Sequence, residues 1–136
     1  MTGPSARPPD MPAMRSLRAL RGATTVDRDS AADLLGAAAE LLRALLDRNA
    51  LGVGDVVSII FTTTRDLSSA DPSRAARELG WDHVPVLCMS EISVPTGLAR
   101  CVRVLMHVDV PRERARPLPI YLRKAASLRP DLASRA

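Results

Sequence analysis

The hydrophobic positions of this 136-residue chain fall into one long helical stretch and several shorter strand-like runs. After Ser30, leucines and alanines recur every three or four residues until about Asn49, and a Gly-Val-Gly break follows. Ser30 with Asp33 resembles a capping box in which Asp stands in place of the usual Glu or Gln. These signals predict an amphipathic helix between Ser30 and Asn49.

Runs rich in branched aliphatic residues predict five strands. They lie at 16–26, 55–62, 84–89, 98–108 and 120–125. A second, short helix is predicted from Asp71-Pro72 to Gly80, because Asp is a good N-cap and proline suits the first helical position. A loop or short helical turn is predicted before the last strand.

The resulting order is β-α-β-α-β-β-β, which predicts a single α+β domain with a mixed sheet and helices on one face. The strand at 98–108 has two distinct faces. Its apolar face consists of Val102, Val104, Met106 and Val108, and its mixed face of Cys101, Arg103, Leu105 and His107. Two helices would cover only one side of such a sheet, and an uncovered, half-apolar side predicts oligomerisation.

The two ends of the chain lack these patterns. We predict a disordered extension at 1–13, a folded domain at 14–127 and a mobile polar tail at 128–136. Neither a signal peptide nor a membrane-spanning run is visible, which predicts a soluble, cytoplasmic protein whose Cys88 and Cys101 are reduced.

The chain has a formal net charge of +4, and Lys124 is its only lysine. Such arginine usage is typical either of a GC-rich genome or of anion recognition, and net charge alone does not separate the two. Aromatic residues make up only 2% of the chain, which argues against a base-stacking nucleic-acid module.

Arg103 stands in the middle of the apolar run at 101–108. A guanidinium cannot lose its charge, and burying it unpaired costs several kcal/mol or more. Arg103 therefore points either to water or into a pocket that an anion fills.

Five short stretches carry a family resemblance. They are Arg21-Gly22-Ala23-Thr24-Thr25, Arg77-Glu78-Leu79, Val84-Pro85-Val86-Leu87-Cys88-Met89-Ser90-Glu91, Cys101-Val102-Arg103-Val104, and Tyr121-Leu122 followed by Leu128-Arg129-Pro130-Asp131-Leu132. In this order and at these separations they resemble the monofunctional chorismate mutases of the trimeric α/β, Bacillus-like class. The resemblance extends from about residue 15 to residue 132.

The resemblance implies a homotrimer whose sheets close into a pseudo-β-barrel, with active sites in clefts between subunits. The implied reaction is the rearrangement of chorismate to prephenate on the route to phenylalanine and tyrosine. It implies no cofactor and no metal. His83 and His107 also lack metal-ligand spacing with the cysteines.

The resemblance also implies roles for individual residues. Arg103 would stabilise the breaking ether oxygen, Glu91 would accept from the ring hydroxyl, and Arg21 would pair with a substrate carboxylate. The implied substrate-binding residues are Cys88, Tyr121, Arg74, Arg77, Leu128 and Arg129. Among these, Arg77 at the cleft mouth and Arg129 in the tail would serve entry and closure.

Plainer interpretations of these residues stand beside the functional ones. Cys88 is a common type of small buried hydrophobe, and Tyr121 is typical of a core edge. Asp71 stands where the best-known members of the family have an aromatic residue, and we expect its carboxylate to turn to the helix start.

Two alternative functions stay open: an imine-hydrolysing deaminase on a similar trimeric fold, and a non-catalytic small-anion-binding trimer.

Overall fold

The computed structural model describes residues 14–95, 97–113 and 116–133. The disordered extension predicted at 1–13 therefore lies outside the described residues. The mobile tail predicted at 128–136 lies partly outside them, because residues 134–136 are not described.

The elements follow the predicted order β-α-β-α-β-β-β, with short 3-10 helices and one further α-helix added. They are β1 (Arg15–Thr25), α1 (Ala31–Arg48), η1 (Val53–Asp55), β2 (Val56–Thr63), α2 (Ser73–Glu78), β3 (Val86–Ser90), β4 (Cys101–Pro111), β5 (Ile120–Tyr121), η2 (Arg123–Leu128) and α3 (Pro130–Ala133). No helix among the described residues is both long and apolar enough to cross a lipid bilayer.

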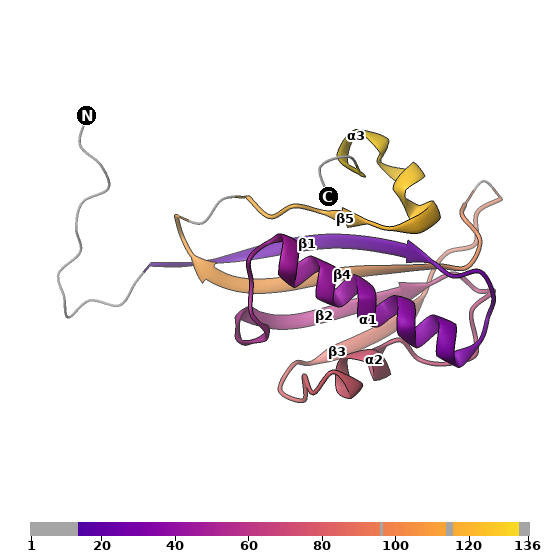
Figure 1. Ribbon diagram of the computed structural model, residues 1–136, viewed down its shortest axis with the longest axis horizontal. Helices are drawn as coiled ribbons and strands as arrows, with labels where there is room; N and C mark the ends of the chain where they lie inside the picture. The colour runs from indigo at the N-terminus through magenta and orange to yellow at the C-terminus, as the bar shows by residue number, and fades with distance from the viewer. Residues whose placement is uncertain (1–13, 96, 114–115, 134–136) are drawn as a thin grey trace.

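The five strands form one mixed sheet in the order β3-β2-β4-β1-β5. The central strand β4 is antiparallel to β1 and β2, whereas β5 runs parallel to β1 and β3 parallel to β2. Figure 1 shows α1 lying across the strands, with α2 close to β3. The chain thus has the predicted α+β fold with α1 and α2 on one face of the sheet.

The first turn of α1 forms half of the predicted capping box. The Ser30 hydroxyl accepts from the Asp33 N–H at 3.1 Å, as an N-cap does. The Asp33 carboxylate accepts from Arg28 Nε at 2.8 Å, and the Ser30 N–H donates to the Arg28 carbonyl. Asp33 is therefore an ion-pair partner of Arg28 and does not complete the box.

The main core lies between α1 and the apolar face of β4. Val102, Val104, Met106 and Val108 are at most 3% exposed, which confirms the predicted apolar face. Each aliphatic side chain buried there contributes roughly 1.5–3 kcal/mol. Gly22 on β1 lets α1 pack close to the sheet, since a Cβ at this position would lie 3.0 Å from Leu41 Cδ1.

The opposite side of the sheet, called the open face below, carries no long helix in the part of the chain that the structure describes. It consists of Leu17, Ala19, Arg21, Ala23, Ser58, Ile60, Thr62, Leu87, Met89, Arg103, Leu105 and His107. Leu17 is 63% exposed, Leu87 58% and Met89 46%. At one end η2 covers Ala23 and Cys101, so that Cys101 is buried despite belonging to the mixed face.

The C-terminal part differs from the prediction. The last strand, expected to reach Ala125, ends at Tyr121. Arg123 has a left-handed φ of 53°, and the Lys124 N–H donates to the Thr25 hydroxyl at 3.2 Å, so the backbone leaves the β1 ladder and enters η2. The tail, predicted without secondary structure, contains α3.

Other boundaries shift by one to three residues. Helix α2 starts at Ser73, two residues after the predicted start. Strand β4 begins at Cys101 because Arg100 has φ 48°, where its N–H donates to the Asp66 carboxylate at 2.8 Å and its carbonyl accepts from Val26.

Candidate active site

Arg103 lies in a row of side chains that crosses the open face. It pairs with Thr62 on β2 and with Ala23 on β1, and Ala23 pairs with Tyr121 on β5. Residues that face each other in a sheet project to the same side. The row therefore brings Arg103 and Tyr121, which are 18 residues apart in sequence, to one surface.

Arg21 belongs to the neighbouring row, where it pairs with Leu105. It is thus a diagonal neighbour of Arg103, at a separation that long side chains span. Both arginines line a hollow of about 380 Å³, together with Ile60, Thr62, Met89, Val104 and Leu105. Two guanidinium groups at one shallow hollow form a site suited to an anion with more than one negative group.

Glu91 follows β3 directly and extends its pairing, since its N–H donates to the Thr63 carbonyl at 2.8 Å. Its carboxylate accepts from the Thr62 hydroxyl at 2.7 Å and lies 3.2 Å from Arg103 Nε. The side chains are 17% exposed for Glu91 and 30% for Arg103. A partly buried pair that is also fixed by a hydroxyl is held more firmly than an ion pair in open solvent.

A second hollow, of about 360 Å³, lies at the Arg103–Glu91 pair. Its other lining residues are Thr64, Arg65, Asp66, Ile92, Ser93, Val94, Gly97, Leu98 and Ala99. Arg103 lines both hollows, and the bond to Glu91 uses only its Nε. Because a guanidinium carries five N–H donors, Arg103 retains donors for a ligand in either hollow.

Tyr121 is 6% exposed and belongs to a small cluster at the end of the open face. The cluster also contains Ala23, Cys101 and Ala125, with Leu128 packed against it. Arg129 is exposed, follows Leu128 directly, and pairs with Asp131 at 3.3 Å. The C-terminal candidates Leu128 and Arg129 therefore adjoin the Arg103 row from the side of η2.

Cys88 lies on the other side of the sheet. It pairs with Phe61, which is fully buried under the helices, and its side chain packs against the main core. Burial, and then the nearby carboxylate of Asp71, raise the pKa of the Cys88 thiol to about 11. Cys88 is therefore a neutral thiol at physiological pH, separated from Arg103 by the sheet.

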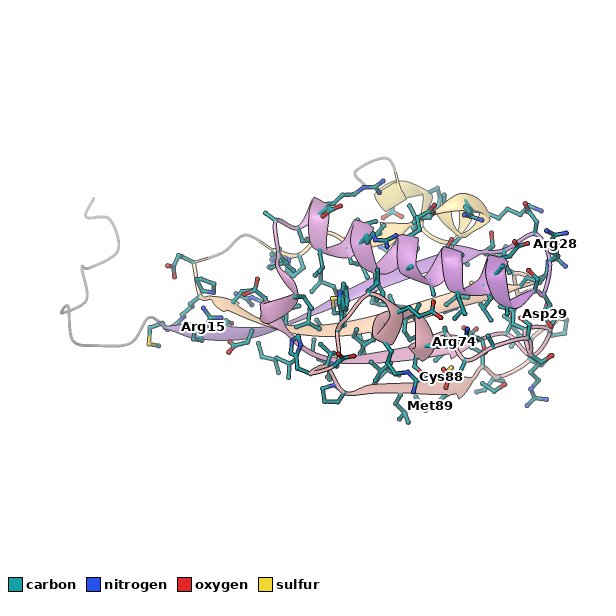
Figure 2. All side chains as sticks on the ribbon, turned by 60° about the horizontal axis from the view of Figure 1, so that its bottom comes forward. Arg15, Arg28, Asp29, Arg74, Cys88 and Met89 are labelled. Atoms are coloured by element: carbon teal, nitrogen blue, oxygen red, sulfur yellow. The ribbon has the colours of Figure 1, made fainter. Side chains whose placement is uncertain are left out.

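Asp71 turns to α2, as expected from the sequence. Its Oδ1 accepts from the Ser73 N–H at 2.8 Å. On the same helix, Arg74 pairs with Glu78 at 3.0 Å, and Arg77 is exposed in the last turn. Figure 2 labels Arg74 and Cys88, and shows Met89, the next residue of β3, projecting outward from the strand.

The predicted site residues thus form two groups on opposite sides of one sheet. The open-face group consists of Arg21, Glu91, Arg103, Tyr121, Leu128 and Arg129, and the helix-side group of Arg74, Arg77 and Cys88. Within one chain, the sheet therefore lies between Arg103 and Cys88.

Sequence reasoning missed Thr62, which joins the open-face group through its bond to Glu91. The available signal was a polar residue two positions after Ile60 on a predicted strand, where alternation places both on one face. His107 bonds Ser58 at 3.3 Å on the same face. Among the described residues, no group of three or more His, Cys, Asp or Glu side chains could hold a metal ion.

Comparison with known proteins supports one chemistry for this arrangement. The family model described as "Chorismate mutase type I" matches residues 17–132. The chain is 43% identical over 120 residues to the chorismate mutase AroH of Bacillus subtilis (strain 168), covering 86% of this chain and 93% of that protein. It is 42% identical over 121 residues to the chorismate mutase AroH of Thermus thermophilus, covering 87% and 98%.

A solved structure gives the same result. The chorismate mutase from Clostridium thermocellum superposes with a TM-score of 0.77 at 40% sequence identity. The match covers 80% of this chain and 97% of that one. The likeness therefore extends over nearly the whole of the known enzyme.

Proposed function

The chain belongs to the chorismate mutase type I family and converts chorismate to prephenate, and we propose that it does so at a site built around Arg103. This rearrangement breaks one C–O bond and forms one C–C bond within the same molecule. Its chemical demands are therefore a compact substrate conformer and stabilisation of the charge that develops during bond breaking.

Arg103 would stabilise the charge that develops during bond breaking. Negative charge grows on the ether oxygen as the C–O bond breaks, and a fixed guanidinium stabilises that charge more than it stabilises the ground state. The observation that carries this role is the bond between Arg103 Nε and Glu91, which fixes the cation while leaving it on the lining of both hollows. A cation placed in advance does not have to reorganise during the reaction.

The residues around Arg103 would hold the substrate in its compact conformer. Arg21 shares a hollow with Arg103 and would bind a substrate carboxylate. Glu91 would accept from the ring hydroxyl and lie near the positive character that develops on the ring. Tyr121 would donate to a carboxylate from the end of the same row. Leu128 and Arg129 would close this end of the site.

We assign the helix-side group to the site of a neighbouring copy. Cys88, Arg74 and Arg77 of one chain would then face the open face of the next chain, and each site would be shared by two subunits. Two observations support this assignment: the sheet separates the groups within one chain, and the open face exposes Leu87 and Met89. In the trimer implied by the sequence resemblance, a neighbouring subunit would cover the open face. Its helix-side group would then lie against the open-face group of the first chain.

Family membership decides between the functions that the sequence left open. It favours the mutase over an imine-hydrolysing deaminase and over a non-catalytic anion binder. A cytoplasmic location and independence of cofactors and metals remain part of the proposal.

One assay tests the proposed function. Purified protein is dialysed against a chelator and mixed with chorismate alone, and loss of chorismate and formation of prephenate are measured together. We expect turnover well above the uncatalysed rate without any added cofactor. Folded, assembled protein that leaves chorismate at its background rate of decay would exclude the proposal.

A further inference from the structure

Asn49, at the C-cap of α1, bonds both backbone groups of one residue far along the chain. The Leu118 N–H donates to Asn49 Oδ1 at 2.6 Å, and Asn49 Nδ2 donates to the Leu118 carbonyl at 3.0 Å. The same Nδ2 donates to the Leu45 carbonyl at 2.9 Å, which ties the amide to the last turn of α1. Asn49 thus bonds Leu118 as a strand partner would, across 69 residues of sequence.

This contact fixes the segment that leads into β5. Strand β5 has only two residues, and so short a ladder holds its register weakly. Ile120 anchors it by burial in the main core, and the Leu122 N–H donates to the Ala23 carbonyl at 2.9 Å. The Asn49–Leu118 contact holds the segment on the N-terminal side of the strand.

The register of β5 decides where Tyr121 points. Successive side chains of a strand project to opposite faces, so a slip of one residue would move Tyr121 away from the open face. In the observed register Ile120 faces the helices and Tyr121 lies with Ala23 in the row of Arg103. The direction of Tyr121 therefore depends on what holds the residues before it.

We propose that Asn49 is a positioning residue, which sets the register of β5 and so places Tyr121 in the active site. The inference rests on the substrate-binding role proposed for Tyr121. Asn49 itself belongs to the end of α1, which covers the opposite face of the sheet, so it acts through β5 and not on the substrate. An amide is required because Leu118 offers one donor and one acceptor.

The kinetic test is a double-mutant cycle between Asn49 and Tyr121. We expect Asn49→Ala and Tyr121→Phe each to raise KM roughly tenfold, the change expected for loss of one hydrogen bond to a charged group. The double variant should raise KM no further than Tyr121→Phe alone. Asn49→Asp should not rescue, since a carboxylate cannot donate to the Leu118 carbonyl.

Ser30→Ala provides the matched control. It removes the cap at the other end of α1 and lowers the melting temperature without touching β5. We expect its KM and kcat to match those of the unmodified protein at temperatures far below melting. The inference would be overturned by an Asn49→Ala variant with unchanged KM. It would equally be overturned if Asn49→Ala raised KM by the same factor when added to Tyr121→Phe as when introduced alone.

A second readout does not depend on catalysis. Tyr121 is the only tyrosine of the chain, so 3-fluorotyrosine labelling gives a single fluorine resonance from this position. We expect Asn49→Ala to shift or broaden that resonance and Ser30→Ala to leave it unchanged. An identical resonance in Asn49→Ala would contradict the positioning role. If the unmodified protein fails to consume chorismate, the proposed function fails, and the fluorine spectra still decide what Asn49 does.

Discussion

Arg103 Nε lies 3.2 Å from the carboxylate of Glu91, and both side chains are partly shielded from water. The cation is therefore held in place by a carboxylate of its own chain. The same contact satisfies a carboxylate that would otherwise repel a dianionic substrate. This pair is the centre of the proposed mechanism.

Replacing Arg103 with Lys should lower kcat far more than it changes KM. Lysine keeps the charge but loses the planar fork, so it cannot bond Glu91 and the ether oxygen together in the observed geometry. Removal of a comparable transition-state donor costs roughly 10²–10³-fold in kcat. Steady-state kinetics with chorismate measure both constants. An unchanged kcat would remove Arg103 from the mechanism.

Replacing Thr62 with Val should lower kcat roughly tenfold while KM stays nearly constant. Valine has a similar shape but no hydroxyl, so Glu91 loses the bond at 2.7 Å, and a hydrogen bond to a charged group contributes about 1.5 kcal/mol. Thr62→Ser, which keeps a hydroxyl, is the matched control and should retain most of the activity. A Val variant as active as the Ser variant would show that Glu91 does not need Thr62.

Much of this arrangement could be predicted from the sequence, because it depends on local patterns. Leucine spacing predicts α1, and alternation at 101–108 predicts the two faces of β4. The placement of Cys88 opposite Arg103 depends on the pairing of β3 with β2, a long-range register that periodicity does not determine. The contact between Asn49 and Leu118 is equally non-local, and the end of β5 depends on a side-chain bond from Thr25.

The shared site can be tested by mixing two variants that are defective in different groups. Arg103→Ala disables the open-face group, and the double variant Arg74→Ala/Arg77→Ala weakens the helix-side group. After joint unfolding and refolding in equal amounts, about a quarter of the sites should combine two intact groups, as statistical pairing of subunits requires. Turnover at low chorismate concentration should therefore recover in the mixture.

The control mixture combines Arg103→Ala with Arg21→Ala. Both changes lie in the open-face group, so every site formed by mixing would still carry one defect. We expect no recovery there. Recovery in both mixtures, or in neither, would contradict a site divided between the open face of one chain and the helix side of another.

Replacing Asp71 with Asn should lower the pKa of Cys88 from about 11, because burial raises that pKa first and the Asp71 carboxylate raises it further. Asn can still accept from the Ser73 N–H, so α2 keeps its start. Burial also remains in the variant, so the fall should be partial. The pH dependence of Cys88 alkylation measures it, with Cys101→Ala as background to remove the other thiol. An unchanged alkylation profile would show that the Asp71 charge does not act on Cys88.

Asp29 should make stability depend on pH in the acid range. Hydrogen bonds from Ser69 and Ser68 hold the pKa of Asp29 below its ordinary value. A carboxylate with a lowered folded-state pKa stabilises the protein above the unfolded-state pKa, near 4, and that contribution is lost as the pH falls through the folded-state pKa. The melting temperature of Asp29→Asn should therefore lie below that of the unmodified protein at pH 7, and the two should converge once the pH is below the folded-state pKa. Melting curves of both proteins across this range provide the measurement, and a constant difference at every pH would show that the Asp29 charge does not stabilise the loop.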